Sequence, residues 1–126
     1  MRPQPLITVR DVEASSLWYQ KLLGCQSRHG GAAYDRLEKD GQTILQLHHR
    51  DMREHGLDTP DDTQPGRGII LWFSTDTFDA DIERARGLGV DFIDERRFNA
   101  NARHVESWIR DPDGYVVVIS GQGAHP

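Results

Sequence analysis

The 126-residue sequence has a mass of 14.3 kDa, which is typical of one domain that buries about two thirds of the surface of its unfolded chain. Its net charge is −5 and it has no block of Lys and Arg, so we expect no nucleic-acid partner. The longest apolar runs, 68–73 and 115–119, are far shorter than the ~20 residues of a membrane helix, and the N-terminus shows no signal pattern. We therefore expect a soluble, unexported protein with no membrane partner.

Cysteine usage favours a reducing compartment. The single cysteine, Cys25, cannot form an internal disulfide and has no second thiolate with which to build a metal site. A cytoplasmic location fits this pattern. Cys25 itself is expected to be a small buried apolar residue, because no neighbouring base suggests a reactive thiolate.

The first half of the chain predicts a strand, a helix and further strands. A β-branched run at 5–10 precedes a helix over Val12–Leu23, with Asp11 as its N-cap and Gly24 as its stop. Strand-like segments follow at 34–38 and 43–48. The apolar or small residues of this helix at helical spacing predict its packed face: Ala14, Leu17, Trp18 and Leu22.

The second half repeats this order. A strand at 68–75 precedes a helix capped by Asp76 or Thr77, which ends at Leu88-Gly89. The packed face of this helix is predicted to hold Phe78, Ile82 and Ala85. Three strands are expected at 90–93, 104–109 and 115–119, and the turn at 111–114 joins the last two as an antiparallel pair.

The spacing of the two helix stops indicates a duplication. Gly24 and Gly89 are 65 residues apart, just over half the chain, and each half is predicted to be strand, helix, then two or three strands. The predicted organisation is one α+β domain over 1–126. It comprises a first module at 4–49, a Pro-containing, acidic linker at 50–67 and a second module at 68–121.

Alternation along the strands separates two faces of the sheets. One face is apolar and is expected to meet the helices: Ile7, Val9, Leu45, Leu47, Ile69, Leu71, Phe73, Val105, Ile109, Tyr115, Val117 and Ile119. The other face is mixed: Gln4, Leu6, Thr8, Gln46, His48, Ile70, Trp72, His104, Glu106, Trp108, Val116 and Val118. The mixed face is either a binding pocket or a partly solvated surface.

The combination of elements resembles the vicinal oxygen chelate superfamily, the group of glyoxalases, bleomycin resistance proteins and extradiol dioxygenases. The resemblance rests on Val9-Arg10-Asp11 before a helix bearing Trp18-Tyr19, on the two Leu-Gly stops, and on the closing hairpin 110–115. It implies two tandem βαβββ modules that form curled mixed sheets with helices on the outer face. It also implies a homodimer.

The resemblance further implies where a metal would lie. Metal-dependent members carry four ligands, and the matching positions here are Gln4, Gln46, Ile70 and Val118. An aliphatic side chain has no lone pair to donate, so we expect no metal cofactor. The segment 106–114 is similar to bleomycin resistance proteins, which bind a drug and perform no chemistry on it.

The sequence therefore indicates two alternative functions. The first is a metal-independent protein that binds an aromatic or amphipathic small molecule, with the following predicted ligand-binding residues: Gln4, Gln46, His48, Ile70, Trp72, His104, Glu106, Trp108 and Val118. The second is a lyase, isomerase or dioxygenase of the same fold. It would use either one divalent metal ion on His48, His104 and Glu106, or metal-free acid/base catalysis by these residues.

Several of these residues have a second interpretation. Glu106 is a general base if burial raises its pKa, or a salt-bridged residue paired with Arg103 or Arg110. Trp72 and Trp108 either stack on a flat ligand or fill the sheet face. The cluster of His48, His49, Asp51 and His55 is read as surface histidines, because adjacent strand residues point to opposite faces.

Overall fold

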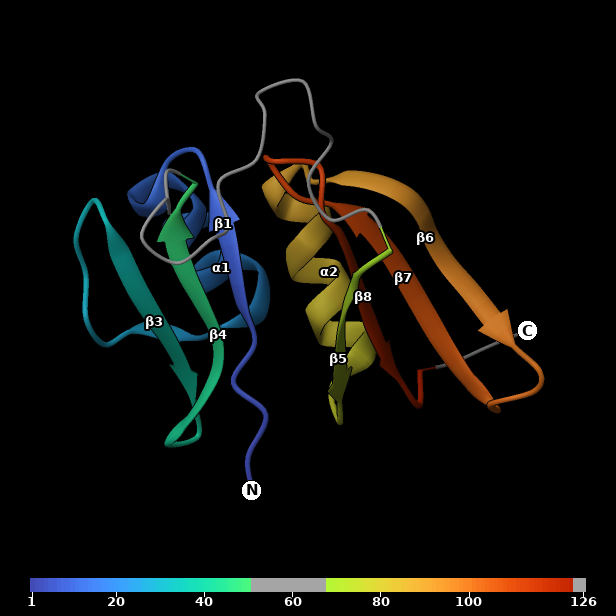
Figure 1. Ribbon diagram of the computed structural model, residues 1–126. Helices are drawn as coiled ribbons and strands as arrows, with labels where there is room; N and C mark the ends of the chain where they lie inside the picture. The colour runs from blue at the N-terminus through green and yellow to red at the C-terminus, as the bar shows by residue number, and fades with distance from the viewer. Residues whose placement is uncertain (51–67, 124–126) are drawn as a thin grey trace. The chain divides into compact units, whose positions relative to one another are not determined.

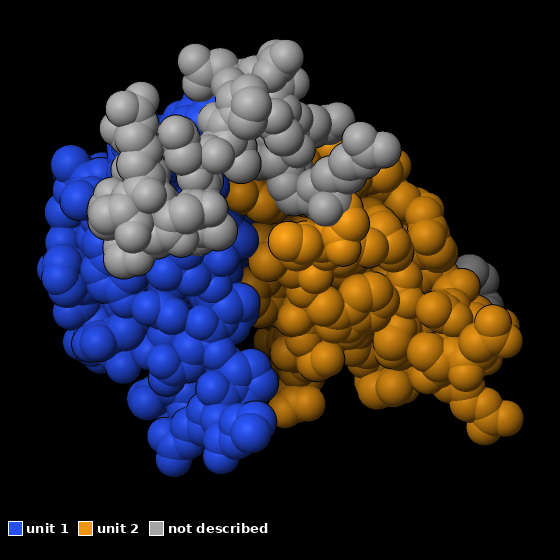
Figure 2. Space-filling view, viewed as in Figure 1, with its two compact units in different colours: residues 1–63 blue, residues 64–126 orange. Residues whose placement is uncertain are grey.

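The chain divides into two units, Met1–Thr63 and Gln64–Pro126, coloured separately in Figure 2. The computed structural model describes residues 1–50 and 68–123. The predicted linker 50–67, apart from Arg50, lies outside the described residues, as do Asp51 and His55. No helix in the described ranges is long and apolar enough to cross a membrane.

The first unit is a four-stranded mixed sheet with one helix (Figure 1). Its strand order is β1-β4-β3-β2, in which β1 runs parallel to β4 and the other pairs are antiparallel. The short strand β2 was not predicted from the sequence. In chain order the elements are β1 (Leu6–Val9), α1 (Val12–Leu23), β2 (Gln26–Ser27), β3 (Tyr34–Lys39) and β4 (Gln42–His49).

The second unit repeats the first. Its strand order is β5-β8-β7-β6, with β5 parallel to β8 and the other pairs antiparallel. The shared βαβββ order and shared sheet topology confirm the predicted α+β fold of two tandem modules. In chain order the elements are β5 (Ile70–Thr75), α2 (Phe78–Leu88), β6 (Asp91–Asn99), β7 (His104–Arg110) and β8 (Val116–Gly121).

Strand β6 is longer than predicted. It continues from the expected segment 90–93 to Asn99, and its pairing with β7 shifts register between Phe92 and Asp94 and again between Asp94 and Arg97. These shifts break the alternation of apolar and polar residues. For that reason the sequence pattern does not predict the second half of the strand.

The helix ends agree with the predictions. The Asp11 carboxylate accepts a hydrogen bond from the backbone N–H of Ala14, and Gly24 and Gly89 adopt left-handed φ angles of 65° and 67°. Thr77, the second of the two candidates, is the N-cap of α2. The turn at 111–114 is closed by a 3.0 Å hydrogen bond from the N–H of Gly114 to the carbonyl of Asp111.

The predicted packed face of α1 is wrong at three of its four residues, and only Leu22 is buried as expected. Ala14 is exposed, Leu17 is 55% exposed and Trp18 is only half-buried. Two serines, Ser15 and Ser16, are buried instead, and Ser16 hydrogen-bonds a buried carboxylate, Asp35. The buried residues of α1 are Val12, Ser15, Ser16, Tyr19, Leu22 and Leu23.

The predicted packed face of α2 is confirmed, with Asp81 as an additional buried residue. The predicted helix-facing set of the strands is largely buried as well. Its exceptions are Ile69, which precedes β5 and is 53% exposed, and Phe73, which is half-buried. Burial of this apolar face is the main stabilising contribution in each unit.

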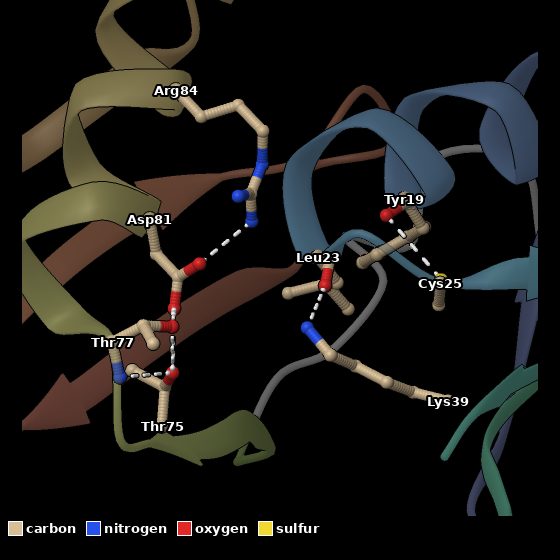
Figure 3. A network of polar contacts seen from close by, with 8 residues as sticks. All are labelled: Tyr19, Leu23, Cys25, Lys39, Thr75, Thr77, Asp81 and Arg84. Carbon is tan, nitrogen blue, oxygen red and sulfur yellow. Dashed lines mark hydrogen bonds and ion pairs between the residues drawn. The ribbon is translucent and has the colours of Figure 1, made fainter. Parts of the chain in front are cut away.

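Polar contacts fix the ends of both helices, and Figure 3 shows them close up. In the second unit, the Asp81 carboxylate accepts hydrogen bonds from the hydroxyls of Thr75 and Thr77 and pairs with Arg84 at 2.8 Å. In the first unit, Nζ of Lys39 donates to the carbonyl of Leu23 at 2.6 Å. The Lys39 bond satisfies a carbonyl that the end of α1 leaves without an intrahelical partner, and the Asp81 bonds tie the first turn of α2 to the end of β5.

Cys25 is buried, as predicted. Its Sγ lies 3.5 Å from the carbonyl oxygen of Tyr19 (Figure 3), and burial raises the pKa of the thiol to about 11. The thiol is therefore protonated and unreactive near neutral pH.

Candidate functional site

The candidate site lies in the second unit, on the face of the sheet opposite α2. Alternation places Trp72, His104, Glu106 and Trp108 on this face, and the strand register sets Trp72 beside Val118 and Val118 beside Trp108. These four residues and Asn99 contact one another, and we call the five together the unit 2 cluster.

Glu106 is the centre of the unit 2 cluster. The residue is 2% exposed, and its carboxylate accepts three hydrogen bonds. Nε1 of Trp108 donates to Oε1 at 2.8 Å, whereas Nδ2 of Asn99 and Nε2 of His104 lie 2.8 and 2.7 Å from Oε2. A buried carboxylate held in this way has a fixed position and its polar atoms are satisfied.

The hydrogen bonds also decide the charge of Glu106. Burial raises the pKa of this carboxyl group, but the bonds from Trp108, Asn99 and His104 outweigh burial, so the pKa lies below its ordinary value. The interpretation of Glu106 as a base whose pKa burial has raised is therefore wrong. The salt bridge expected with Arg103 or Arg110 is not formed: the partners of the carboxylate are Trp108, Asn99 and His104, of which His104 is an ion-pair partner when protonated.

The aromatic residues form the exposed part of the cluster. The Trp72 and Trp108 rings meet edge to face at 6.2 Å, and the Trp72 and His104 centroids are 5.9 Å apart. Nε1 of Trp72 donates to the Ser120 hydroxyl at 2.8 Å, and Trp72 is 44% exposed. Both indole N–H groups are thus used within the protein, and the exposed part of Trp72 remains for contact with a ligand.

An arginine adds positive charge beside the tryptophans. The guanidinium carbon of Arg97 lies 4.8 Å from the centre of the Trp108 ring, and Nε of Arg97 pairs with Asp94 at 3.1 Å. Arg97, Asn99 and Ser120 were not predicted as site residues. Asn99 and Arg97 lie on β6, and the irregular register between β6 and β7 sets their positions. The alternation of apolar and polar residues in the sequence does not predict such register shifts.

The predicted site residues of the first unit are linked to one another through Tyr34 and Gln46. The hydroxyl of Tyr34 donates to Oε1 of Gln46 at 2.6 Å, and Nε2 of Gln46 donates to the backbone carbonyl of Gln4 at 2.8 Å. Nδ1 of His48 lies 2.9 Å from the carbonyl of His49, and its ring is 6.4 Å from Tyr34. The sequence analysis missed Tyr34, whose register partner on β4 is His48.

The four positions that correspond to family metal ligands do not fit a metal. Ile70 is exposed and Val118 is buried, and neither has a donor atom. Of the two glutamines, Gln46 already uses both atoms of its amide. Within residues 1–50 and 68–123, no group of three or more His, Cys, Asp or Glu side chains is arranged to hold a metal ion.

The chain belongs to the Glyoxalase/Bleomycin resistance protein/Dioxygenase superfamily. The sequence model of this family matches residues 3–119. Because the match covers nearly the whole sequence, it confirms the family that the two modules and the closing hairpin predicted. The metal-free branch of that family stays a prediction. No curated protein matches the chain in sequence.

Solved structures show the same fold. A glyoxalase/bleomycin resistance protein/dioxygenase family enzyme from Burkholderia phytofirmans PsJN is 20% identical with a TM-score of 0.77, over 94% of this chain and 96% of its own. A glyoxalase-related enzyme from Fulvimarina pelagi is 14% identical with a TM-score of 0.76, over 97% and 88%. Lactoylglutathione lyase from Agrobacterium tumefaciens is 17% identical with a TM-score of 0.71, over 95% and 92%.

Proposed function

We propose that the protein binds a small planar aromatic molecule on the unit 2 cluster without a metal ion. The observation that carries this proposal is Trp72, a large aromatic residue that is 44% exposed although its indole N–H is already bonded to Ser120. Its ring lies against Trp108 and His104. An exposed aromatic ring that is held in place by its N–H offers stacking area at little conformational cost.

The donor chemistry supports the absence of a metal from this function. Two of the four family ligand positions are aliphatic, and Gln46 is bonded to Tyr34 and Gln4. The other candidate metal ligands include His104 and Glu106, and Nε2 of His104 lies 2.7 Å from Oε2 of Glu106 in a hydrogen bond. A metal shared by these two atoms would have to break that hydrogen bond.

The same contact favours a second candidate function, metal-free acid/base catalysis in a lyase or isomerase of this fold. A histidine held by an ionised carboxylate is the arrangement by which many enzymes orient a base. Turnover of a substrate would distinguish this function from binding alone.

Tryptophan fluorescence tests the binding proposal, with 4-nitroanisole as a neutral aromatic probe. We expect saturable quenching, and we expect Trp72→Ala and Trp108→Ala each to weaken binding by roughly thirtyfold, as loss of an aromatic anchor costs about 2 kcal/mol. Trp18→Ala is the matched control, because Trp18 lies on α1 in the other unit. Quenching that does not saturate, or that only Trp18→Ala abolishes, would overturn the proposal.

We also propose that the protein acts as a cytoplasmic homodimer. Exposed apolar residues on the first strand of each unit, namely Leu6 on β1 and Ile70 on β5, support self-association, since such surfaces mark interfaces. The single, buried Cys25 fits a reducing compartment. Light scattering should give the mass of a dimer at micromolar concentration, whereas a monomer mass would refute the assembly.

A further inference from the structure

The unit 2 cluster contains a histidine whose orientation is fixed from one side. Nε2 of His104 lies 2.7 Å from Oε2 of Glu106, and the same carboxylate is bonded to Asn99 and Trp108. Asn99 and Trp108 therefore hold the carboxylate in place for the histidine. The ring of His104 also lies 5.9 Å from the exposed ring of Trp72, on which the proposed ligand stacks.

The carboxylate fixes the tautomer of this histidine. An ionised carboxylate only accepts hydrogen bonds, so Nε2 of His104 carries the hydrogen in the 2.7 Å contact. The lowered pKa of Glu106 keeps this carboxylate ionised at neutral pH. In the neutral ring, Nδ1 then bears the lone pair.

Nδ1 is the nitrogen that a ligand can meet. About a fifth of the His104 side chain is exposed, whereas Glu106, to which Nε2 is turned, is almost fully buried. Of the two ring nitrogens, Nδ1 is thus the one that is not turned to the buried carboxylate. In the part of the chain that the structure describes, Nδ1 has no hydrogen-bond partner.

We propose that His104 accepts a proton from the ligand, and that the ligand is a planar aromatic molecule with an acidic hydroxyl group, such as a phenol. This inference rests on the proposed function, since it requires a ring stacked on Trp72. The ligand O–H bond breaks, its electron pair stays on the oxygen, and an N–H bond forms at Nδ1. The products are a bound phenolate and an imidazolium whose charge Glu106 stabilises, so Glu106 is a positioning residue.

Charged groups on neighbouring strands are compatible with this step. Arg97 on β6 is the register partner of Glu106, and its guanidinium lies over Trp108. A positive charge at this place favours a phenolate over a neutral phenol. The nearby acid, Asp94, is paired with Arg97.

The test compares two probes that differ by one methyl group. 4-Nitrophenol carries the acidic hydroxyl, and 4-nitroanisole is its methyl ether. Below the pKa of free 4-nitrophenol, we expect the protein to bind the phenol at least about tenfold more tightly than the ether, the gain of one charge-assisted hydrogen bond. The visible absorption band of the phenolate should grow in proportion to the bound fraction.

Two variants assign the effect to the histidine and its carboxylate. His104→Gln should abolish the phenolate band and the tenfold preference for the phenol, both measured relative to the variant's own affinity for 4-nitroanisole. Glu106→Gln should weaken both effects, because a neutral amide no longer stabilises the imidazolium. Should Glu106→Gln fail to fold, the ¹⁵N spectrum of wild-type His104 tests the same step, since it must show hydrogen on Nε2 before the phenol binds.

The two proposals fail in different ways. If neither probe binds, the proposed function is wrong and the inference falls with it. If both probes bind equally, if no phenolate band appears, or if His104→Gln retains the band, then stacking stands and only the role of His104 is overturned. Hydrogen on Nδ1 in the unliganded protein would also overturn that role.

Discussion

The hydroxyl of Ser16 on α1 donates a 2.6 Å hydrogen bond to Oδ2 of Asp35 on β3, and both residues are buried. Oδ1 of Asp35 accepts further bonds from the Ser27 hydroxyl and from the backbone N–H groups of His29, Gly30 and Arg36. One carboxylate thus joins the helix, the sheet and the loop between β2 and β3. Such a carboxylate is stable in the interior because donors surround it.

We expect Asp35→Asn to lower the free energy of unfolding by about 2 kcal/mol or more. The amide keeps the shape but loses the negative charge that strengthens five hydrogen bonds, and bonds to charged groups contribute about 1.5–3 kcal/mol each. Urea denaturation measures the change. Glu13→Gln, an exposed carboxylate in the first turn of α1, is the matched control and should shift stability by only a few tenths of a kcal/mol.

The same residue predicts a loss of stability in acid. Burial raises the pKa of Asp35, but the hydrogen bonds from Ser16, Gly30, Ser27 and Arg36 outweigh burial and leave it lowered. The stabilisation is therefore complete above the unfolded value of about 3.9 and disappears as pH falls through the lower folded value. In Asp35→Asn, the free energy of unfolding should depend less on pH in this range. If the variant loses stability in acid as steeply as the wild type does, Asp35 is not the group responsible.

Asp35 also explains what the sequence could predict and what it could not. Helix ends, the closing turn and the buried strand faces depend on residues close in sequence, and these predictions held for Asp11, Gly24, Gly89 and the turn at 111–114. The packed face of α1 depends on a partner 19 residues away, because Asp35 draws Ser16 into the core. Apolar spacing therefore favoured the exposed Leu17 over Ser16.

The unit 2 cluster shows the same division. Strand parity placed Trp72, His104, Glu106 and Trp108 on one face, because alternation is local. The charge of Glu106 depends on Asn99, which is brought to it by the shifted register of β6. Sequence alone therefore supplied the members of the cluster on β5 and β7, but not the direction of the pKa shift of Glu106.

Gly121→Ala should destabilise the second unit. A Cβ at this position would lie 2.5 Å from the carbonyl oxygen of Thr75 and 3.1 Å from Cβ of Phe78, so β8 must move away from β5. Overpacking of this kind costs roughly 1–3 kcal/mol. Thermal unfolding measures it. Gly87→Ala in α2 is the opposite control, because open space surrounds it and alanine should stabilise the helix by about 0.5–1 kcal/mol.

Ser107→Ala should be neutral or stabilising by up to about 1 kcal/mol. Its hydroxyl is fully buried on β7 and has no hydrogen-bond partner within the described residues, so the folded state bears an uncompensated desolvation cost. Ser16→Ala is the control. It removes a hydroxyl that donates a hydrogen bond to Asp35, and it should destabilise the protein. A clear loss of stability in Ser107→Ala, measured by urea denaturation, would mean that this hydroxyl has a partner after all.

Trp108→Phe separates the two tasks of Trp108 in the unit 2 cluster. Phenylalanine retains an aromatic face but lacks the indole N–H that donates to Oε1 of Glu106 at 2.8 Å. We expect the affinity for 4-nitroanisole to fall by no more than about threefold, against the roughly thirtyfold loss expected of Trp108→Ala. The pKa of Glu106 should rise, because burial remains while the first of its stabilising hydrogen bonds is gone. Carboxyl ¹³C titration measures that rise. If Trp108→Phe weakens binding as much as Trp108→Ala does, the position of Glu106 governs affinity and the stacking surface of Trp108 does not.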